Sequence, residues 1–187
     1  MKLILASNSP RRKEILSKFG FIFTVIKSDY EEKESFSDAF SLVKTFAEKK
    51  AEHVFNALSK KDKKTSVVLG ADTVVVSDGK ILGKPKDKKD AANMLSALSG
   101  KTHLVLTGYA IISNGKTLSG VTKTEVVFNN LSDELIKEYI ATGSPMDKAG
   151  AYGIQDGFPL VKEYYGSIYN VIGLPIEEIS PILKKLL

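Results

Sequence analysis

Hydrophobic and polar residues follow two periods along the chain, one typical of strands and one typical of helices. Continuous or alternating apolar runs predict strands at residues 2–6, 21–26, 67–76, 80–82, 103–113 and 117–128. Apolar residues three and four positions apart predict helices at residues 10–20 and about 37–58, from Asp87 to Gly100, after Ser132, and from Pro175 onward. Strands that alternate with helices are typical of the α/β class.

Turn and cap residues mark the ends of these elements. Ser9-Pro10 predicts a helix start, with serine as the N-cap and proline at the first helical position. Asp78-Gly79 and Asn114-Gly115 predict tight hairpin turns. Residues 59–64, which are rich in lysine, are expected to form a solvated loop, and residues 148–173 form a glycine-punctuated stretch. Without an internal repeat or a linker, residues 1–187 are expected to form a single domain.

The composition is that of an ordinary globular protein and excludes several kinds of chemistry. Hydrophobic residues make up 43% of the 187 residues and charged residues 26%. The absence of cysteine excludes disulfide scaffolds, thiol nucleophiles and cysteine-ligated metals, and two histidines are too few for a histidine-rich metal site. No apolar run approaches the roughly 20 residues of a membrane span. We therefore expect a cytoplasmic protein with no membrane partner.

Charge is distributed unevenly between the two kinds of cationic side chain. The formal net charge is +5, and all but two of the 27 cationic residues are lysine. The two arginines are adjacent, Arg11 and Arg12, which favours a place where a planar guanidinium is needed to bind phosphate. The lysines are dispersed and form no basic stripe between aromatic residues, so we expect no nucleic-acid partner.

The segment from Ser7 to Arg12 is a candidate phosphate-binding loop. It follows a predicted strand and opens a predicted helix, where free backbone N–H groups attract anions. Two positive charges in a first helical turn are unfavourable unless an anion binds there. The alternative is a pair of surface arginines that tolerates this small cost.

Charged side chains in apolar surroundings give further candidates. Asp72 lies within the most apolar predicted strand, where a carboxylate is costly unless it is paired, hydrogen-bonded or bound to a metal. Backbone N–H groups nearby could also satisfy it. Lys50 interrupts an apolar helical stripe and Lys84 follows a hairpin, so each could reach phosphate or simply extend to solvent. Glu31-Glu32 could supply a metal ligand or form a solvated loop.

Taken in order, several ungapped motifs make the chain resemble the Maf family of nucleoside triphosphate pyrophosphatases, which is also named for septum formation. The resemblance extends over essentially the whole chain. The segments that carry it are 5–12, 70–75, 83–85, 98–103, 147–155 and 169–175.

The resemblance implies a mixed, twisted sheet with flanking helices, in two lobes around a cleft, as in inosine-triphosphate pyrophosphatases (the Maf/Ham fold). It implies a homodimer that uses Mg²⁺ or Mn²⁺ to hydrolyse a nucleoside triphosphate to the monophosphate and pyrophosphate. Arg11, Thr73 and Gln155 match the branch that acts on dTTP and UTP, with modified pyrimidine nucleotides as further candidates. The branch that acts on 7-methyl-GTP differs at all three positions.

Roles for individual residues follow from this resemblance as a hypothesis. Asp72 is the expected general base, and Glu32 together with Asp72 the expected metal site. Arg11, Thr73 and Gln155 are expected to determine substrate specificity. The expected phosphate-binding residues are Ser7, Ser9, Arg11, Arg12, Lys50 and Lys84.

The chain departs from the family pattern directly after Gln155. Residues 156–160 are one residue shorter than the usual glycine-rich link, and Asp156 is expected to alter how Gln155 is presented. Three alternatives stay open at this point: a pyrophosphatase for 7-methyl-GTP or another non-standard nucleotide, a cell-division regulator that binds nucleotides without turnover, and a basic nucleic-acid-binding protein.

Overall fold

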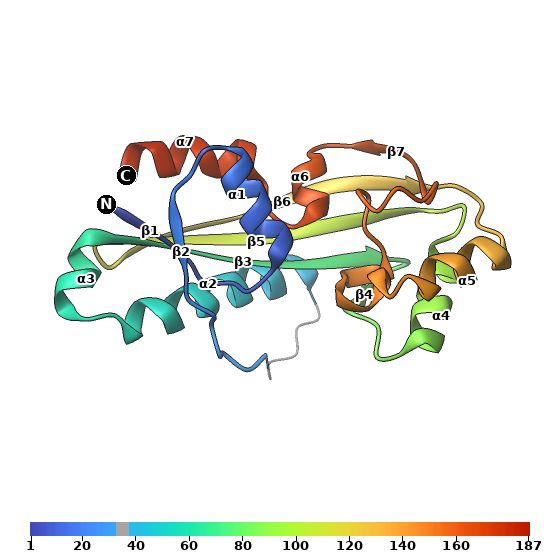
Figure 1. Ribbon diagram of the computed structural model, residues 1–187, viewed down its shortest axis with the longest axis horizontal. Coiled ribbons are helices and arrows are strands. Elements are labelled where there is room, and N and C mark those ends of the chain that lie inside the picture. Colours follow the sequence, from blue (N-terminus) through green and yellow to red (C-terminus); the bar gives the residue numbers. More distant parts are fainter. Residues whose placement is uncertain (33–37) are drawn as a thin grey trace. The chain divides into compact units, whose positions relative to one another are not determined.

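The computed structural model describes residues 1–32 and 38–187, and its elements are drawn in Figure 1. The strands are β1 (Lys2–Leu5), β2 (Phe23–Val25), β3 (Ser66–Ser77), β4 (Lys80–Leu82), β5 (Thr102–Ser113), β6 (Lys116–Phe128) and β7 (Val161–Tyr165). The α-helices are α1 (Pro10–Lys18), α2 (Ala39–Ala57), α3 (Lys60–Thr65), α4 (Lys88–Leu98), α5 (Asp133–Ala141), α6 (Ile168–Ile172) and α7 (Ile176–Leu186). Two short 3-10 helices, η1 (Ser144–Asp147) and η2 (Ala149–Ala151), lie between α5 and β7.

The strands described here form one seven-stranded sheet in the order β2-β1-β3-β5-β6-β7, with β4 paired to β3. β1 pairs in parallel with both β2 and β3, whereas β4 and β7 pair antiparallel with β3 and β6. The sheet is therefore mixed, and the predicted α/β fold with flanking helices is confirmed.

Most predicted elements lie within a few residues of the observed ones. Both hairpin turns have positive φ at their two central residues, Asp78 (49°) and Gly79 (73°), and Asn114 (50°) and Gly115 (73°), as the sequence predicted. The start of the predicted helix at about residue 37 falls outside the described residues, and α2 is seen from Ala39 with Asp38 as its N-cap.

The prediction of a loop at residues 59–64 is wrong. The helix α3 forms there because the Ser59 side chain accepts a hydrogen bond from the backbone N–H of Asp62, and Lys63 donates to the carbonyl of Asn56 at 3.0 Å. A serine N-cap can therefore begin a short helix even in a lysine-rich segment.

The chain divides into two compact units. Unit 1 comprises residues 1–72, 107–122 and 173–187, and unit 2 comprises residues 73–106 and 123–172. The strands β3, β5 and β6 contribute residues to both units. Each unit has its own hydrophobic core, which agrees with the two lobes that the resemblance implied.

In unit 1 the sheet is covered on both faces, by α2 on one side and by α1 and α7 on the other (Figure 1). Residues of even number in β1 and β3 face α2, where Ile4 and Val68 pack against Ala47 and Ala51. Because side chains alternate along a strand, Gly70 and Asp72 lie on this same face. The two-residue period of β3 therefore directs Asp72 toward α2.

Glycines allow α2 to lie directly on the sheet. A Cβ added to Gly70 would lie 2.4 Å from the carbonyl oxygen of Ala47 and 2.9 Å from the nitrogen of Ala51. A Cβ added to Gly108 would likewise meet the backbone of Val43. Since these neighbours are backbone atoms of α2, any larger residue would push the helix away from the sheet.

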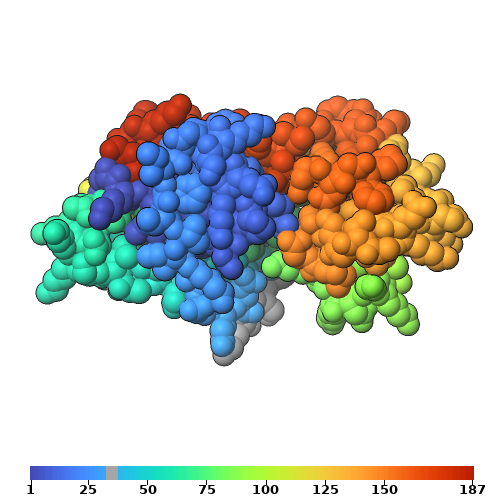
Figure 2. All heavy atoms as spheres, viewed as in Figure 1, coloured from blue at the N-terminus to red at the C-terminus, as the bar shows by residue number. Residues whose placement is uncertain are grey.

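The two ends of the chain meet in unit 1. The amino group of Met1 donates a hydrogen bond to the carbonyl oxygen of Leu187 at 2.8 Å. Figure 2 shows the corresponding atoms, blue and red, covering adjoining parts of the surface. The N-terminal strand is thereby tied to the last helix, α7.

The core of unit 2 combines aliphatic side chains with a cluster of aromatic rings. Leu95 and Leu98 of α4 pack in the same core cluster as Tyr139 and Ile140 of α5. The His103 ring contacts both Phe128 and Tyr152 edge to face, at 4.9 and 5.3 Å between centroids. In neither unit does a described helix combine the length and hydropathy needed to cross a membrane.

Candidate functional site

The loop between β1 and α1 has the features of an anion-binding loop. Ser7 follows the buried end of β1, and its hydroxyl accepts hydrogen bonds from the Ser9 backbone N–H at 3.2 Å and from Arg12 Nη1 at 3.1 Å. Ser9 precedes α1 without capping it through its side chain, and the first turn contains no acidic residue. The N-terminal N–H groups of α1 therefore keep the capacity to bind an anion.

Arg12 is held in place by backbone as well as side-chain contacts. Its Nε donates to the carbonyl oxygen of Gly173 at 2.8 Å, which ties α1 to the segment before α7. Burial lowers the pKa of the Arg12 guanidinium, while the charges of Asp72 and Glu32 act in the opposite direction and that of Arg11 adds to the lowering. The guanidinium stays charged because its ordinary pKa is far above neutral pH.

A single lysine joins the two acidic candidates. Lys50 Nζ lies 2.6 Å from Asp72 Oδ1 and 2.6 Å from Glu32 Oε1. The side chains of Lys50 and Asp72 are only 17% and 13% exposed, whereas that of Glu32 is 44% exposed. A carboxylate as buried as Asp72 requires such a partner, and Lys50 supplies it.

The position of Lys50 follows from the packing of α2. Ala47 and Ala51 contact the sheet at Gly70, two residues before Asp72 on the same face of β3. Lys50 lies between these alanines in the helix, and its long side chain reaches Asp72 along the apolar contact. The lysine that interrupts the apolar stripe of the sequence is thus the partner of the aspartate that interrupts the apolar strand.

The two carboxylates fit a hard divalent cation. Mg²⁺ takes oxygen ligands and is commonly bound by one or two carboxylates, with water and substrate phosphates in the other positions. Asp72 and Glu32 contact the same ammonium group, so their oxygens converge on one place. Among residues 1–32 and 38–187, no group of three or more acidic or histidine side chains could hold a metal by itself. The donor set suits a cation shared with a substrate.

In unit 2, the structure brings two of the predicted segments together. The Gly150 backbone N–H donates to the Gly83 carbonyl oxygen at 3.0 Å, so the loop before Lys84 lies against the segment that leads to Gln155. Lys84 and Gln155 are both exposed. Thr73, Lys84 and Gln155 belong to unit 2, and the structure therefore does not place them with Ser7, Arg12, Glu32, Lys50 and Asp72 of unit 1.

The segment before Gln155 has an unusual backbone. Gly150 (φ 67°) and Ala151 (φ 60°) are consecutive residues in the left-handed region, and Ala151 is fully buried. Glycine is required at 150, because a Cβ there would lie 2.8 Å from Val75 Cγ2. A buried alanine in this conformation is strained, and strain of this kind concentrates at functional sites.

Sequence reasoning missed several contributors to these sites. The carbonyl of Gly173 and the hydroxyl of Tyr139 act through atoms that carry no charge, so no pattern of charged residues could reveal them. Lys148 was not singled out either, although it is at least as buried as Asp72 and lies 3.5 Å from Asp156. A buried lysine within a glycine-rich stretch is the signal that could have revealed this network.

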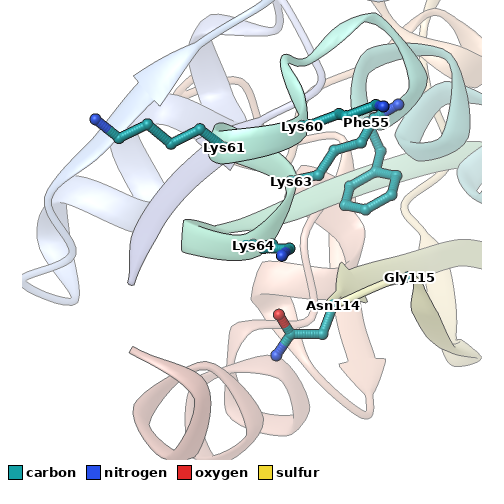
Figure 3. A pocket seen from close by; sticks show the side chains of 7 residues that line it. All are labelled: Phe55, Lys60, Lys61, Lys63, Lys64, Asn114 and Gly115. Atoms are coloured by element: carbon teal, nitrogen blue, oxygen red, sulfur yellow. The ribbon is translucent and has the colours of Figure 1, made fainter.

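A separate lysine-rich hollow of about 920 Å³ occurs in unit 1 (Figure 3). It is lined by Phe55, Lys60, Lys61, Lys63, Lys64, Asn114 and Gly115. Figure 3 shows that Lys61 points away from the others, and Lys63 is bonded to the carbonyl of Asn56. Because Lys61 points away and the Lys63 amino group is bonded to a backbone carbonyl, the lysines of this hollow do not form one phosphate cradle.

Taken together, the mixed sheet with flanking helices, the open helix terminus beside two arginines and the lysine-bridged carboxylates describe an α/β protein with a candidate anion-binding site. A family model described as Maf-like protein matches residues 2–186. The chain belongs to the Maf family, and the predicted resemblance is confirmed.

Relatives named dTTP/UTP pyrophosphatase resemble the chain over most of its length. The protein from Thermococcus kodakarensis is 50% identical over 94% of this chain and 92% of its own. Those from Clostridium acetobutylicum and Alkaliphilus metalliredigens are 47% and 46% identical, each over 98% of this chain and 96% and 95% of their own.

A solved structure supports the fold at low sequence similarity. The Ham1 protein of Staphylococcus aureus is 12% identical and superposes with a TM-score of 0.51, covering 99% of both chains. The predicted likeness to the Maf/Ham fold is confirmed.

Proposed function

We propose that this protein hydrolyses dTTP and UTP to the nucleoside monophosphate and pyrophosphate. The observation that carries the proposal is the Asp72–Lys50–Glu32 group beside the Ser7–Arg12 loop, in a chain 50% identical to a protein named dTTP/UTP pyrophosphatase. The first feature supports the reaction, and the second supports the choice of substrate.

The phosphate chain of the substrate binds at the β1–α1 loop. Ser7, Ser9 and the N-terminal N–H groups of α1 donate hydrogen bonds, and Arg11 and Arg12 neutralise the charge. Arg12 is already oriented by Gly173 and Ser7, so little side-chain freedom is lost when the substrate binds. Lys50 and Lys84 complete the set of phosphate-binding residues in this proposal.

Asp72 acts as the general base. Lys50 contacts Oδ1 of the carboxylate, and Oδ2 takes a proton from a water molecule. The water oxygen forms a bond to the α-phosphorus, and the bond from that phosphorus to the bridging oxygen breaks, so that pyrophosphate leaves. Lys50 fixes the orientation of the base during this step.

Glu32 and Asp72 would hold the divalent cation. When bound, Mg²⁺ or Mn²⁺ supplies positive charge to the phosphate oxygens as negative charge spreads over them. Because Lys50 occupies the space between both carboxylates, it must give way or share Asp72 when the cation and substrate enter.

Arg11, Thr73 and Gln155 determine which base is accepted. Thr73 directly follows Asp72 on β3, and its hydroxyl can both donate and accept a hydrogen bond. The amide of Gln155 has both donors and an acceptor, which suits the pyrimidine edge of thymine or uracil.

A cytoplasmic location and a homodimer are also part of the proposal, and both rest on the family resemblance alone. Sedimentation of the purified protein tests whether it is a dimer.

The direct test measures pyrophosphate release from dTTP, UTP, CTP, GTP, 7-methyl-GTP and dITP, with Mg²⁺, with Mn²⁺ and with EDTA. We expect release from dTTP and UTP that requires the metal and falls by at least about 10³-fold in Asp72→Asn. Asp62→Asn, a partly exposed carboxylate of α3 outside the candidate site, is the matched control and should retain full activity.

Each other outcome has a definite meaning. Release mainly from 7-methyl-GTP or dITP would keep the reaction and overturn the specificity roles of Arg11, Thr73 and Gln155. Binding without release would assign the protein to the nucleotide-binding regulators. Full activity in Asp72→Asn would remove the general-base role.

A further inference from the structure

The turn that carries Gln155 is closed at both ends by one buried hydroxyl group. We propose that Tyr139 and Asp156 form a clamp on this turn, and that the clamp sets the discrimination between nucleotide bases by fixing where Gln155 lies. This inference rests on the proposed function, since it assigns positioning residues to the same substrate site.

Residues 153–156 form a tight turn. The Asp156 backbone N–H donates to the Gly153 carbonyl oxygen at 3.1 Å, which places Gln155 at the third position of the four. Gln155 is exposed, whereas the side chain of Asp156 is only 12% exposed. The turn therefore has one side chain directed to solvent and the next one anchored in the protein.

Tyr139 holds both ends of the turn with a single oxygen. The Gly153 backbone N–H donates to Tyr139 Oη at 2.9 Å, and the same hydroxyl donates its proton to Asp156 Oδ2 at 2.7 Å. Tyr139 is fully buried in the core of unit 2 and lies in the last turn of α5. Its ring also packs on Phe158, so the oxygen has little freedom to move.

Two further residues fix the carboxylate of Asp156. Ser144 Oγ donates to Asp156 Oδ2 at 2.6 Å, and Lys148 Nζ lies 3.5 Å from the same atom. Lys148 in turn donates to Ser144 at its carbonyl oxygen (2.6 Å) and its hydroxyl (2.9 Å). A hydrogen-bonded network of this kind is rigid because each buried group would be unsatisfied without its partner.

The absence of a side chain at Gly153 allows the clamp to close. A Cβ there would lie 2.6 Å from Asp156 Oδ1 and 2.7 Å from Lys148 Cε. The carboxylate and the lysine thus pack directly against the first residue of the turn. With no room between them, the turn cannot shift without breaking the network.

The hydroxyl of Tyr139 also stays protonated under all ordinary conditions. Burial and the hydrogen bond to Asp156 raise the pKa of Tyr139 well above its usual value. The hydroxyl can therefore act as donor to Asp156 and acceptor from Gly153 at neutral pH.

A positioning role and a merely structural role for the clamp predict different kinetic effects when the clamp is loosened. Displacing a side chain that contacts substrate by about 1 Å can reduce the rate about 10²-fold, and here the displaced side chain reads the base rather than the reacting phosphorus. Loosening the clamp should therefore change the ratio of kcat/KM between bases and leave kcat for dTTP largely intact.

The test measures kcat/KM for dTTP and for CTP, whose pyrimidine edges differ, in Tyr139→Phe and Asp156→Asn. We expect the dTTP-to-CTP ratio to fall roughly ten- to hundredfold in each variant, with kcat for dTTP changed less than about threefold. In a Gln155→Ala background, Asp156→Asn should produce no further change in the ratio. Tyr165→Phe is the matched control, since it removes an exposed hydroxyl that donates to Glu163 at 2.9 Å.

Urea denaturation shows which variants are folded, and Asp156→Asn decides the question if Tyr139→Phe does not fold. An unchanged ratio in a folded clamp variant overturns the inference. So does an equal loss of activity toward all nucleotides, or an additive effect in the Gln155→Ala background. If the unaltered protein releases pyrophosphate from no nucleotide, the proposed function itself fails and the clamp fails with it.

Discussion

At the scale of single residues, Lys50 determines whether the two acidic candidates can lie together. Its ammonium group is the 2.6 Å partner of both Asp72 and Glu32. Without it, only the nearby Arg12 guanidinium would offset the charges of a mostly buried carboxylate and of a second carboxylate beside it. The stability of unit 1 and the geometry of the candidate base therefore depend on one side chain.

We predict that Lys50→Met lowers the free energy of unfolding by roughly 1–3 kcal/mol in EDTA, the cost of leaving a buried polar group unpaired. Added Mn²⁺ should restore part of that loss, because a cation between the carboxylates replaces the missing charge. Urea denaturation at pH 7 measures both effects. Lys49→Met is the control, since Lys49 pairs with Glu52 at 3.4 Å and both side chains are exposed. Equal stability of the two variants would contradict the prediction.

Each half of the Asp72–Lys50 pair could be predicted from the sequence, and the pair itself could not. Asp72 and Lys50 were each visible as a charge in an apolar pattern. They lie 22 residues apart, and their contact depends on how α2 rests on β3. The Tyr139–Asp156 clamp was hidden for a further reason, because tyrosines are ordinary core residues and only three-dimensional packing shows where the hydroxyl points.

At the scale of elements, the contact between α2 and β3 positions the candidate site. Ala47, Ala51 and Gly70 allow a separation that no larger side chains would permit. The predicted helix and strand were both correct, but a sequence pattern gives the face of each element and not the distance between them. The prediction of a loop at residues 59–64 was wrong for a different reason. It was based on the many lysines of the segment and overlooked Ser59 as a helix N-cap.

We predict that Gly70→Ala destabilises the protein by roughly 1–3 kcal/mol, the usual cost of overpacking. The added Cβ meets backbone atoms at 2.4 and 2.9 Å, so α2 must move outward and carry Lys50 away from Asp72. Activity should fall further than the loss of folded protein explains. Thermal denaturation and pyrophosphate release measure the two effects, with Gly83→Ala as the stability control because a Cβ there meets nothing within 4 Å.

At the scale of the whole molecule, stability should depend on pH through His103. Burial lowers the pKa of this histidine from 6.5 to about 4, while its Nε2 lies 2.8 Å from the Tyr152 hydroxyl. Between these two pH values the unfolded chain binds a proton that the folded protein does not. Stability therefore falls as the pH is lowered from about 6.5 to about 4, and this contribution is complete at neutral pH.

We predict that His103→Gln flattens the pH dependence of unfolding between pH 6.5 and 4, where His103 contributes on the order of 3 kcal/mol. Glutamine keeps a hydrogen-bonding group toward Tyr152 and has no proton to gain in this range. Urea denaturation at several pH values measures the slope, and His53→Gln on the exposed side of α2 is the control. A slope that persists unchanged in His103→Gln would assign the effect to other groups.

The closed turn at Gly153–Asp156 has a consequence for how substrate choice can evolve or be engineered. In the proposed clamp, Gln155 is positioned by Tyr139 and Asp156, which do not contact the nucleotide. Replacing these two residues can therefore change where Gln155 lies. Libraries that vary only the lining of the substrate site would leave Tyr139, Ser144 and Lys148 unexplored. New base preferences could therefore be sought in the core of unit 2, with every contact to the phosphates left untouched.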